Sequence, residues 1–225
     1  MPELELRIQI QREQASRQKE RKLRNYRQQN LYIRKGQVLF TGSSLMEQFP
    51  ITEYCVNENL PTVYNRGIGG YTTDEFLDAI DVVLLDLEPS KLFLNIGTND
   101  IRPMSGSEDW FAHLFRNYHR ICRIIKERLP ETTVYLMAYY PVNSHHPLAN
   151  DNPLIQVRTN ENIAKANQMV ETLAESFGFR YIDVGDGLKD TDGNLRIEHT
   201  FDGIHFDAAA YRTVFDRLKK HLEAT

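Results

Sequence analysis

The sequence has 225 residues, of which 41% are hydrophobic and 26% are charged, and its formal net charge is −4. These values are typical of a folded globular protein and argue against a disordered, collagen-like or membrane-spanning chain. The only two cysteines, Cys55 and Cys122, cannot form a disulfide framework, and the first 35 residues hold no apolar run of the kind found in signal peptides. We therefore expect reduced thiols and a cytoplasmic location.

The charged residues are distributed unevenly along the chain. Residues 1–36 hold ten Lys and Arg against four Asp and Glu, whereas the remainder holds 17 against 27. The basic residues alternate with Gln and Glu and lack the aromatic side chains that bind single-stranded nucleic acid. We expect no nucleic-acid partner and no stable membrane insertion. Residues 1–36 are predicted to form a basic arm that is solvated or that docks either on the body, residues 37–225, or on a second copy of the chain.

The arm begins with a predicted helix over residues 3–29, which are good helix formers without Gly or Pro. Five short runs of consecutive apolar residues then predict strands buried on both faces, at 38–40, 62–64, 92–96, 133–138 and 179–183. Helical spacing of apolar residues predicts helices between them, at 74–87, 107–129, 155–177 and 207–222. This alternation indicates a three-layer α/β/α fold with a five-stranded, mostly parallel, doubly wound (flavodoxin-like) sheet and an extra N-terminal helix.

The first three predicted strands end in small or polar residues, at 42–44, 67–70 and 97–100. Ligands of open parallel sheets bind beyond the carboxyl ends of the strands, so these turns are expected to form one site. The irregular segment 143–153 follows the fourth strand and is a candidate wall of that site.

Known cofactor motifs do not fit these turns. The segment 67–70 lacks the G-x-G-x-x-G spacing of dinucleotide-binding proteins, and no Walker motif occurs. Neither H-E-x-x-H nor paired C-x-x-C is present, and the adjacent His145 and His146 are poorly spaced to bind one ion. We expect no cofactor and no metal.

Nucleophilic catalysis fits better. Ser44 follows the first predicted strand and precedes a predicted helical turn, which would expose its hydroxyl at the functional edge. Asp202 and His205 lie three residues apart, so the carboxylate can orient an imidazole that faces the serine. A D-x-x-H pair is a weak signal by itself, because Asp202 can equally cap the following helix.

Taken together, four segments resemble the sequence blocks of the SGNH (GDSL-type) hydrolases: Val38–Leu45, Asn65–Thr73, Gly97–Asp100 and Asp202–His205. The resemblance covers the chain from Val38 to about Leu222. It implies a serine esterase or acylhydrolase that cleaves short-chain acyl esters through an acyl-enzyme. The implied roles are nucleophile for Ser44, general base for His205, orienting carboxylate for Asp202, and oxyanion-hole donors for the Ser44 and Gly70 N–H groups and the Asn99 side chain.

Two positions depart from the usual pattern of the family. Ser43 and Tyr71 stand where the family usually has Asp, so altered packing beside the serine and a reshaped acyl pocket are expected. Tyr71 and Asn143 are candidate substrate contacts, and Asp100 is expected to be a structural hydrogen-bond partner.

A carbohydrate (acetyl) esterase, a lysophospholipase and a non-catalytic binding module of the same fold are the alternatives to this function. His113 and His119 are expected at the surface or boundary of their helix.

Overall fold

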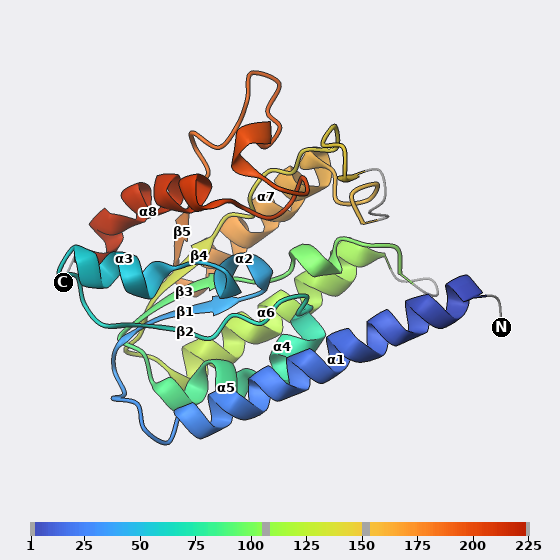
Figure 1. Cartoon of the computed structure of the whole chain (residues 1–225). Helices are drawn as coiled ribbons and strands as arrows, with labels where there is room; N and C mark the ends of the chain where they lie inside the picture. The colour runs from blue at the N-terminus through green and yellow to red at the C-terminus, as the bar shows by residue number, and fades with distance from the viewer. Residues whose placement is uncertain (1–2, 105–108, 150–153, 224–225) are drawn as a thin grey trace.

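The computed structural model describes residues 3–104, 109–149 and 154–223. Its centre is a five-stranded parallel sheet in the order β2-β1-β3-β4-β5 (Figure 1). The strands are β1 (Val38–Gly42), β2 (Val63–Asn65), β3 (Lys91–Asn95), β4 (Thr133–Met137) and β5 (Arg180–Ile182). The predicted doubly wound fold is therefore confirmed.

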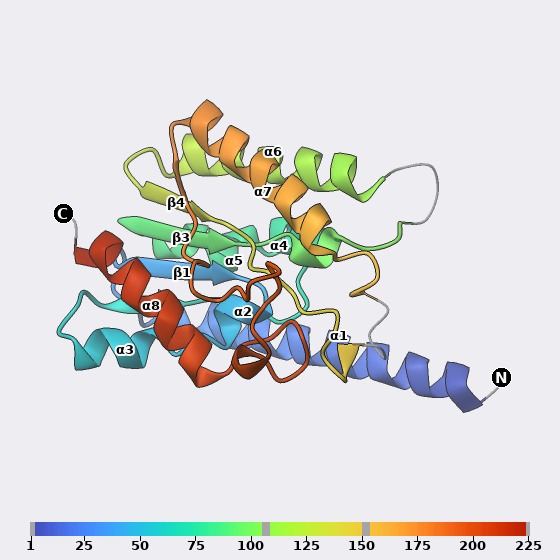
Figure 2. The same ribbon diagram turned by 90° about the horizontal axis from the view of Figure 1, so that it is seen from above.

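Helices cover both faces of the sheet, which makes the three layers visible in Figures 1 and 2. One face packs against α4 (Thr73–Asp78), α5 (Ile80–Val83), α6 (Trp110–Arg128) and α7 (Asn160–Phe177). The other face packs against α2 (Ser44–Glu47), α3 (Ile51–Asn57) and α8 (Ala208–Glu223). Successive strand residues alternate between the faces: Leu92 and Leu94 point to the first and Phe93 to the second.

Aromatic side chains stack across the sheet on the α8 face. Phe40, Phe93 and Tyr135 occupy matching register positions on β1, β3 and β4. Their ring centroids lie 4.5 Å and 4.6 Å apart with nearly parallel planes. Such pairs contribute about 0.5–1.5 kcal/mol each beyond the area they bury. This stack stabilises the centre of the sheet, from which the functional turns extend.

The predicted continuous helix over residues 74–87 is wrong. The segment forms α4, α5 and the 3₁₀ turn η1 (Leu85–Leu87), with breaks at Ala79 and Leu84. Residues 82–85 are all buried, and one straight helix cannot direct four consecutive side chains to the same core. The short elements let the chain bury every one of them.

The N-terminal arm forms the long helix α1 (Glu3–Gln29), which lies along the body beside α5 (Figure 1). Leu23 and Tyr26, in its C-terminal part, pack against the core on the α4–α7 face. Leu6 and Ile10, nearer the N-terminus, remain 46% and 44% exposed. None of the helices in the described ranges is both long enough and apolar enough to cross a membrane.

Candidate active site

Ser44 is the first residue of α2 and follows β1 after a sharp turn. β1 lies between β2 and β3, where the strand order reverses, which is the usual ligand site of a doubly wound sheet. Gly42 makes this turn with φ of +150°, and a Cβ atom there would lie 1.9 Å from the Asn95 carbonyl oxygen. The buried Ser43 starts α2 through its backbone, since its carbonyl accepts from the Glu47 N–H while its side chain makes no capping hydrogen bond.

The structure brings the three predicted polar side chains together across 161 residues of sequence. His205 Nε2 lies 2.9 Å from Ser44 Oγ, and His205 Nδ1 lies 2.6 Å from Asp202 Oδ2. The other oxygen of Asp202 accepts the backbone N–H groups of Ile204 and His205 at 2.9 Å and 2.7 Å. The imidazole therefore bridges the hydroxyl and the carboxylate at ordinary hydrogen-bond distances.

The surroundings of Asp202 keep its side chain ionised. Burial by itself would raise the pKa of Asp202, but the hydrogen bonds from the His205 ring and from the two N–H groups outweigh it and lower the pKa to about 2. A carboxylate that stays negative at neutral pH can hold the Nδ1 proton of the imidazole and leave Nε2 available to the serine.

Three N–H donors lie on the segments that follow β1, β2 and β3. Within residues 3–104, 109–149 and 154–223, neither the Ser44 N–H nor the Gly70 N–H makes a hydrogen bond, which leaves both free to donate. Asn99, in the turn η2 (Thr98–Asp100), donates from Nδ2 to the Tyr71 carbonyl at 2.9 Å. An amide nitrogen carries two hydrogens, so one of them remains for a ligand.

Sequence reasoning missed Arg158, which fixes the orientation of Asn99. Its Nη2 donates to Asn99 Oδ1 at 3.0 Å, and the residue is only 4% exposed. Burial lowers the pKa of Arg158 to about 10, partly offset by the charge of Asp100, so the guanidinium stays protonated at neutral pH. Since a guanidinium can only donate, the amide oxygen must face Arg158 and the amide nitrogen must face away from it. Nothing in the sequence marks this residue, which lies just before α7.

Both candidate substrate contacts are buried residues. Tyr71 is buried in the core, which raises the pKa of its hydroxyl to about 12. Asn143 donates from Nδ2 to the Leu195 carbonyl at 2.7 Å and accepts the His145 N–H at 2.9 Å. Its backbone N–H also donates to the Gly203 carbonyl at 2.8 Å, which ties this loop to the segment that carries Asp202 and His205. The last four residues of the predicted wall, 150–153, lie outside the described residues.

Phe201 is a second neighbour that sequence reasoning did not single out. Its ring stacks on the imidazole of His205, with centroids 5.8 Å apart and planes 12° apart. Phe201 is 54% exposed, which makes it one of the exposed large hydrophobic residues of the described chain.

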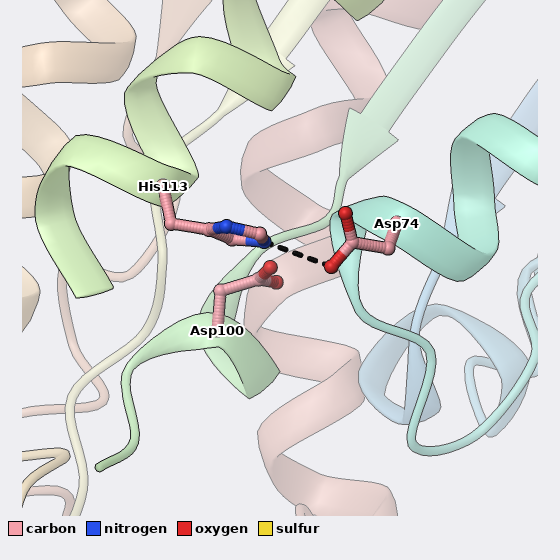
Figure 3. Close-up of side chains that lie close together, drawn as sticks. All are labelled: Asp74, Asp100 and His113. Carbon is pink, nitrogen blue, oxygen red and sulfur yellow. Dashed lines mark hydrogen bonds and ion pairs between the residues drawn. The ribbon is translucent and has the colours of Figure 1, made fainter. Parts of the chain in front are cut away.

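A cluster next to Asn99 offers three groups that could hold a metal ion. Figure 3 shows Asp74 on α4, Asp100 on η2 and His113 on α6 pointing towards one another. Each already has partners: Asp100 accepts from the Thr73 hydroxyl at 2.6 Å, and His113 Nε2 lies 2.8 Å from Asp74 Oδ2. His113 Nδ1 faces the Arg116 guanidinium at 3.0 Å, which only donates. His113 Nε2 also faces the Asn117 side-chain amide at 3.2 Å, so both ring nitrogens already have polar partners that a metal ion would have to displace.

The hydrogen bonds of this cluster test the predictions made for Asp100 and His113. Asp100 is a structural partner as predicted, because its carboxylate accepts the backbone N–H and the hydroxyl of Thr73. The prediction for His113 was wrong: it lies on the buried side of α6 and is only 8% exposed. His119, in contrast, is exposed as expected.

The described geometry can be compared with known proteins. A model of the GDSL-like lipase/acylhydrolase family matches residues 47–213, which is most of the chain. The chain belongs to this family. The match begins three residues after Ser44 and contains Gly70, Asn99, Asp202 and His205. This confirms the predicted resemblance and identifies the protein as a GDSL-type hydrolase.

Among solved structures, this GDSL-family chain resembles a protein from Streptococcus pneumonia provisionally named a platelet activating factor. The two are 29% identical with a TM-score of 0.85, over 96% of this chain and 98% of the other. A GDSL-like lipase from Bacteroides thetaiotaomicron shares the fold, with 20% identity and a TM-score of 0.73 over 89% of this chain and 97% of the other. An acetylxylan esterase from Geobacillus stearothermophilus also shares the fold, with 14% identity and a TM-score of 0.63 over 85% of this chain and 96% of the other.

A curated relative is the N-acylneuraminate cytidylyltransferase of Escherichia coli O18:K1:H7. It is 26% identical over 186 residues, which make up 80% of this chain. The chain spans only 39% of the length of that protein.

Proposed function

We propose that this GDSL-family hydrolase is a serine esterase that cleaves short-chain acyl esters through an acyl-enzyme on Ser44. The observation that carries the proposal is the continuous hydrogen-bonded line from Ser44 Oγ to His205 to Asp202, with contacts of 2.9 Å and 2.6 Å. A hydroxyl is a weak nucleophile unless a base within bonding distance takes its proton, and this line supplies that base.

In the first step, His205 Nε2 accepts the proton of Ser44 Oγ while the oxygen attacks the ester carbonyl. Asp202 stabilises the imidazolium that forms. The tetrahedral intermediate collapses, the bond to the leaving alkoxide breaks, and His205 returns the proton to it. Water then attacks the acyl-enzyme with the same base, which releases the acid and restores Ser44.

The negative charge of the intermediate develops on the former carbonyl oxygen. The proposed donors to it are the Ser44 N–H, the Gly70 N–H and the second hydrogen of Asn99 Nδ2. Donors that are already oriented towards this oxygen need no rearrangement during the reaction, and a single one is typically worth about 10²–10³ in kcat. In this mechanism Arg158 acts through Asn99 and is a positioning residue.

The alternatives differ in the alcohol that leaves and, for a lysophospholipase, also in the length of the acyl chain. A carbohydrate acetyl esterase and a lysophospholipase would use the same steps on different alcohols. The name of the curated relative favours including an O-acetylated N-acylneuraminate in the test panel, beside acetylated xylose, lysophospholipid and aryl esters of increasing acyl length. A preference for acetate over longer chains, whatever the alcohol, is expected.

The test of the catalytic proposal is labelling of Ser44. We expect a fluorophosphonate to modify the wild-type protein at Ser44 and to abolish hydrolysis of an aryl acetate. Ser44→Ala should not be labelled, and its kcat should be lower by about 10⁶. Wild-type protein that is folded but neither labelled nor active would favour the non-catalytic binding module instead.

A further inference from the structure

The Gly70 N–H belongs to a peptide bond that joins two glycines, Gly69 and Gly70. Residues 68–71 form a tight turn in which the Tyr71 N–H donates to the Ile68 carbonyl at 3.2 Å. Gly70 has φ of +72°, whereas Gly69 does not lie in the left-handed region, which is the pattern of a type II turn. Types I and II differ by a flip of the central peptide, here Gly69–Gly70, and the flip would reverse the direction of the Gly70 N–H. With glycine on both sides, no side chain of the turn opposes that flip.

Helix α1 contacts this turn from outside the family match. Lys19 Nζ donates to the Gly70 carbonyl at 2.9 Å, and the Tyr26 hydroxyl donates to the Gly67 carbonyl at 2.9 Å. Between them, Lys22 pairs with Glu47, which in turn accepts the Gly69 N–H. Positions 19, 22 and 26 lie on one face of a helix, so a single rigid element reaches both ends of the turn.

These contacts hold the peptides on either side of the central one. Glu47 fixes the preceding peptide through the Gly69 N–H, and Lys19 fixes the following peptide through the Gly70 carbonyl. Lys19 also donates to both oxygens of Glu75 at 2.7 Å and 2.9 Å. Glu75 in turn forms the capping box of α4 with Thr72. These hydrogen bonds and ion pairs therefore connect the turn to α1, to α2 and to the start of α4.

We propose that α1 is a clamp on the oxyanion hole, in which Lys19 and Tyr26 are positioning residues that keep the Gly70 N–H directed at the reacting oxygen. The inference rests on the proposed esterase function and gives the basic arm a role in that reaction. The Lys19 and Glu75 side chains are 23% and 39% exposed, so the pair is partly shielded from water. Burial raises the pKa of Tyr26 to about 12, and its hydroxyl remains a donor at any physiological pH.

A cavity of about 550 Å³ lies between α1 and the turn. Its walls include Lys19, Lys22, Glu47, Gly69 and Gly70. A substrate group that entered this cavity would contact the clamp directly. The kinetic test must therefore separate positioning, which changes kcat, from binding of the substrate, which changes KM.

The test compares four full-length variants of α1 on one aryl acetate. Lys19→Met removes the donor to Gly70, Tyr26→Phe removes only one hydroxyl, and Arg24→Met is the matched control, an exposed cation of the same helix outside the cavity lining. A misaligned oxyanion donor should lower kcat by roughly tenfold in Lys19→Met and by a smaller factor in Tyr26→Phe. KM should stay within about twofold, and Lys19→Arg, which keeps a donor, should recover most of kcat.

Three results would overturn the clamp. They are unchanged kcat in both clamp variants, a rise in KM at constant kcat, or an equal loss of kcat in Arg24→Met. Thermal melting of each variant shows whether the protein is folded, and Tyr26→Phe keeps the test valid if Lys19→Met unfolds. Failure of the esterase proposal is distinguishable, because wild-type protein would then be inactive and unlabelled at Ser44.

Discussion

Two histidine–carboxylate pairs in the described part of the chain differ in what the second ring nitrogen contacts. In the first pair His205 bonds Asp202 at 2.6 Å, and its other nitrogen faces Ser44 Oγ. In the second pair His113 bonds Asp74 at 2.8 Å, and its other nitrogen faces the Arg116 guanidinium. Each pair has its own carboxylate. A carboxylate partner therefore does not by itself distinguish a catalytic base from a structural histidine.

The two pairs differ in whether the second imidazole nitrogen can exchange a proton with its neighbour. Beside a hydroxyl, an imidazole nitrogen can accept a proton and return it. Beside a guanidinium, which stays charged, the nitrogen only accepts a static hydrogen bond. The second pair instead joins α4 to α6 next to the turn that carries Asn99. A His–Asp contact therefore indicates catalysis only when the remaining nitrogen faces a group that can react.

The largest contrast is expected from removing each histidine in turn. His205→Ala should lower kcat by about 10⁶, because the members of a triad act as a unit. His113→Ala should leave kcat within about tenfold of wild type and lower the free energy of unfolding by about 1–3 kcal/mol, since the packing and the hydrogen bonds of a buried imidazole are lost. Aryl acetate hydrolysis and urea unfolding measure the two effects. A comparable loss of kcat in His113→Ala would make the second pair part of the reaction.

A smaller effect is expected at Asn99. Asn99→Ala should lower kcat by about 10²–10³ through loss of an oxyanion donor. Arg158→Gln should lower it by roughly tenfold, because the Asn99 amide then loses one of the two hydrogen bonds that orient it. If Arg158 acts through Asn99, the double variant should be no slower than Asn99→Ala. Additive losses in this cycle would assign Arg158 a role of its own.

The smallest effect concerns stability at acid pH. The pKa of Asp202 is lowered from 3.8 to about 2 in the folded protein, so this carboxylate stabilises the fold above the unfolded value. That contribution is lost as the pH falls from 3.8 through about 2. Asp202→Asn should therefore lose less stability than wild type over this interval, as measured by urea unfolding at each pH. Identical acid profiles for the two proteins would contradict the ionised state assigned to Asp202.

Local patterns in the sequence predicted the sheet and the residues of the candidate site. The consecutive apolar runs predicted β1 to β5, because strands covered on both faces show this pattern wherever they occur. The turns after β1, β2 and β3 and the Asp202–His205 spacing predicted the candidate site, because parallel strands bring their carboxyl ends to one edge. Each of these signals is contained within a few adjacent residues.

Tertiary structure decided the contacts that depend on long side chains and on packing between distant segments. Arg158 reaches Asn99 across 59 residues, and Lys19 reaches Gly70 across 51. The break of the segment 74–87 and the burial of His113 likewise follow from the shape of the core into which they pack. A periodic pattern specifies which face of an element is apolar, whereas the partner of a flexible polar side chain is fixed only when the chain has folded around it.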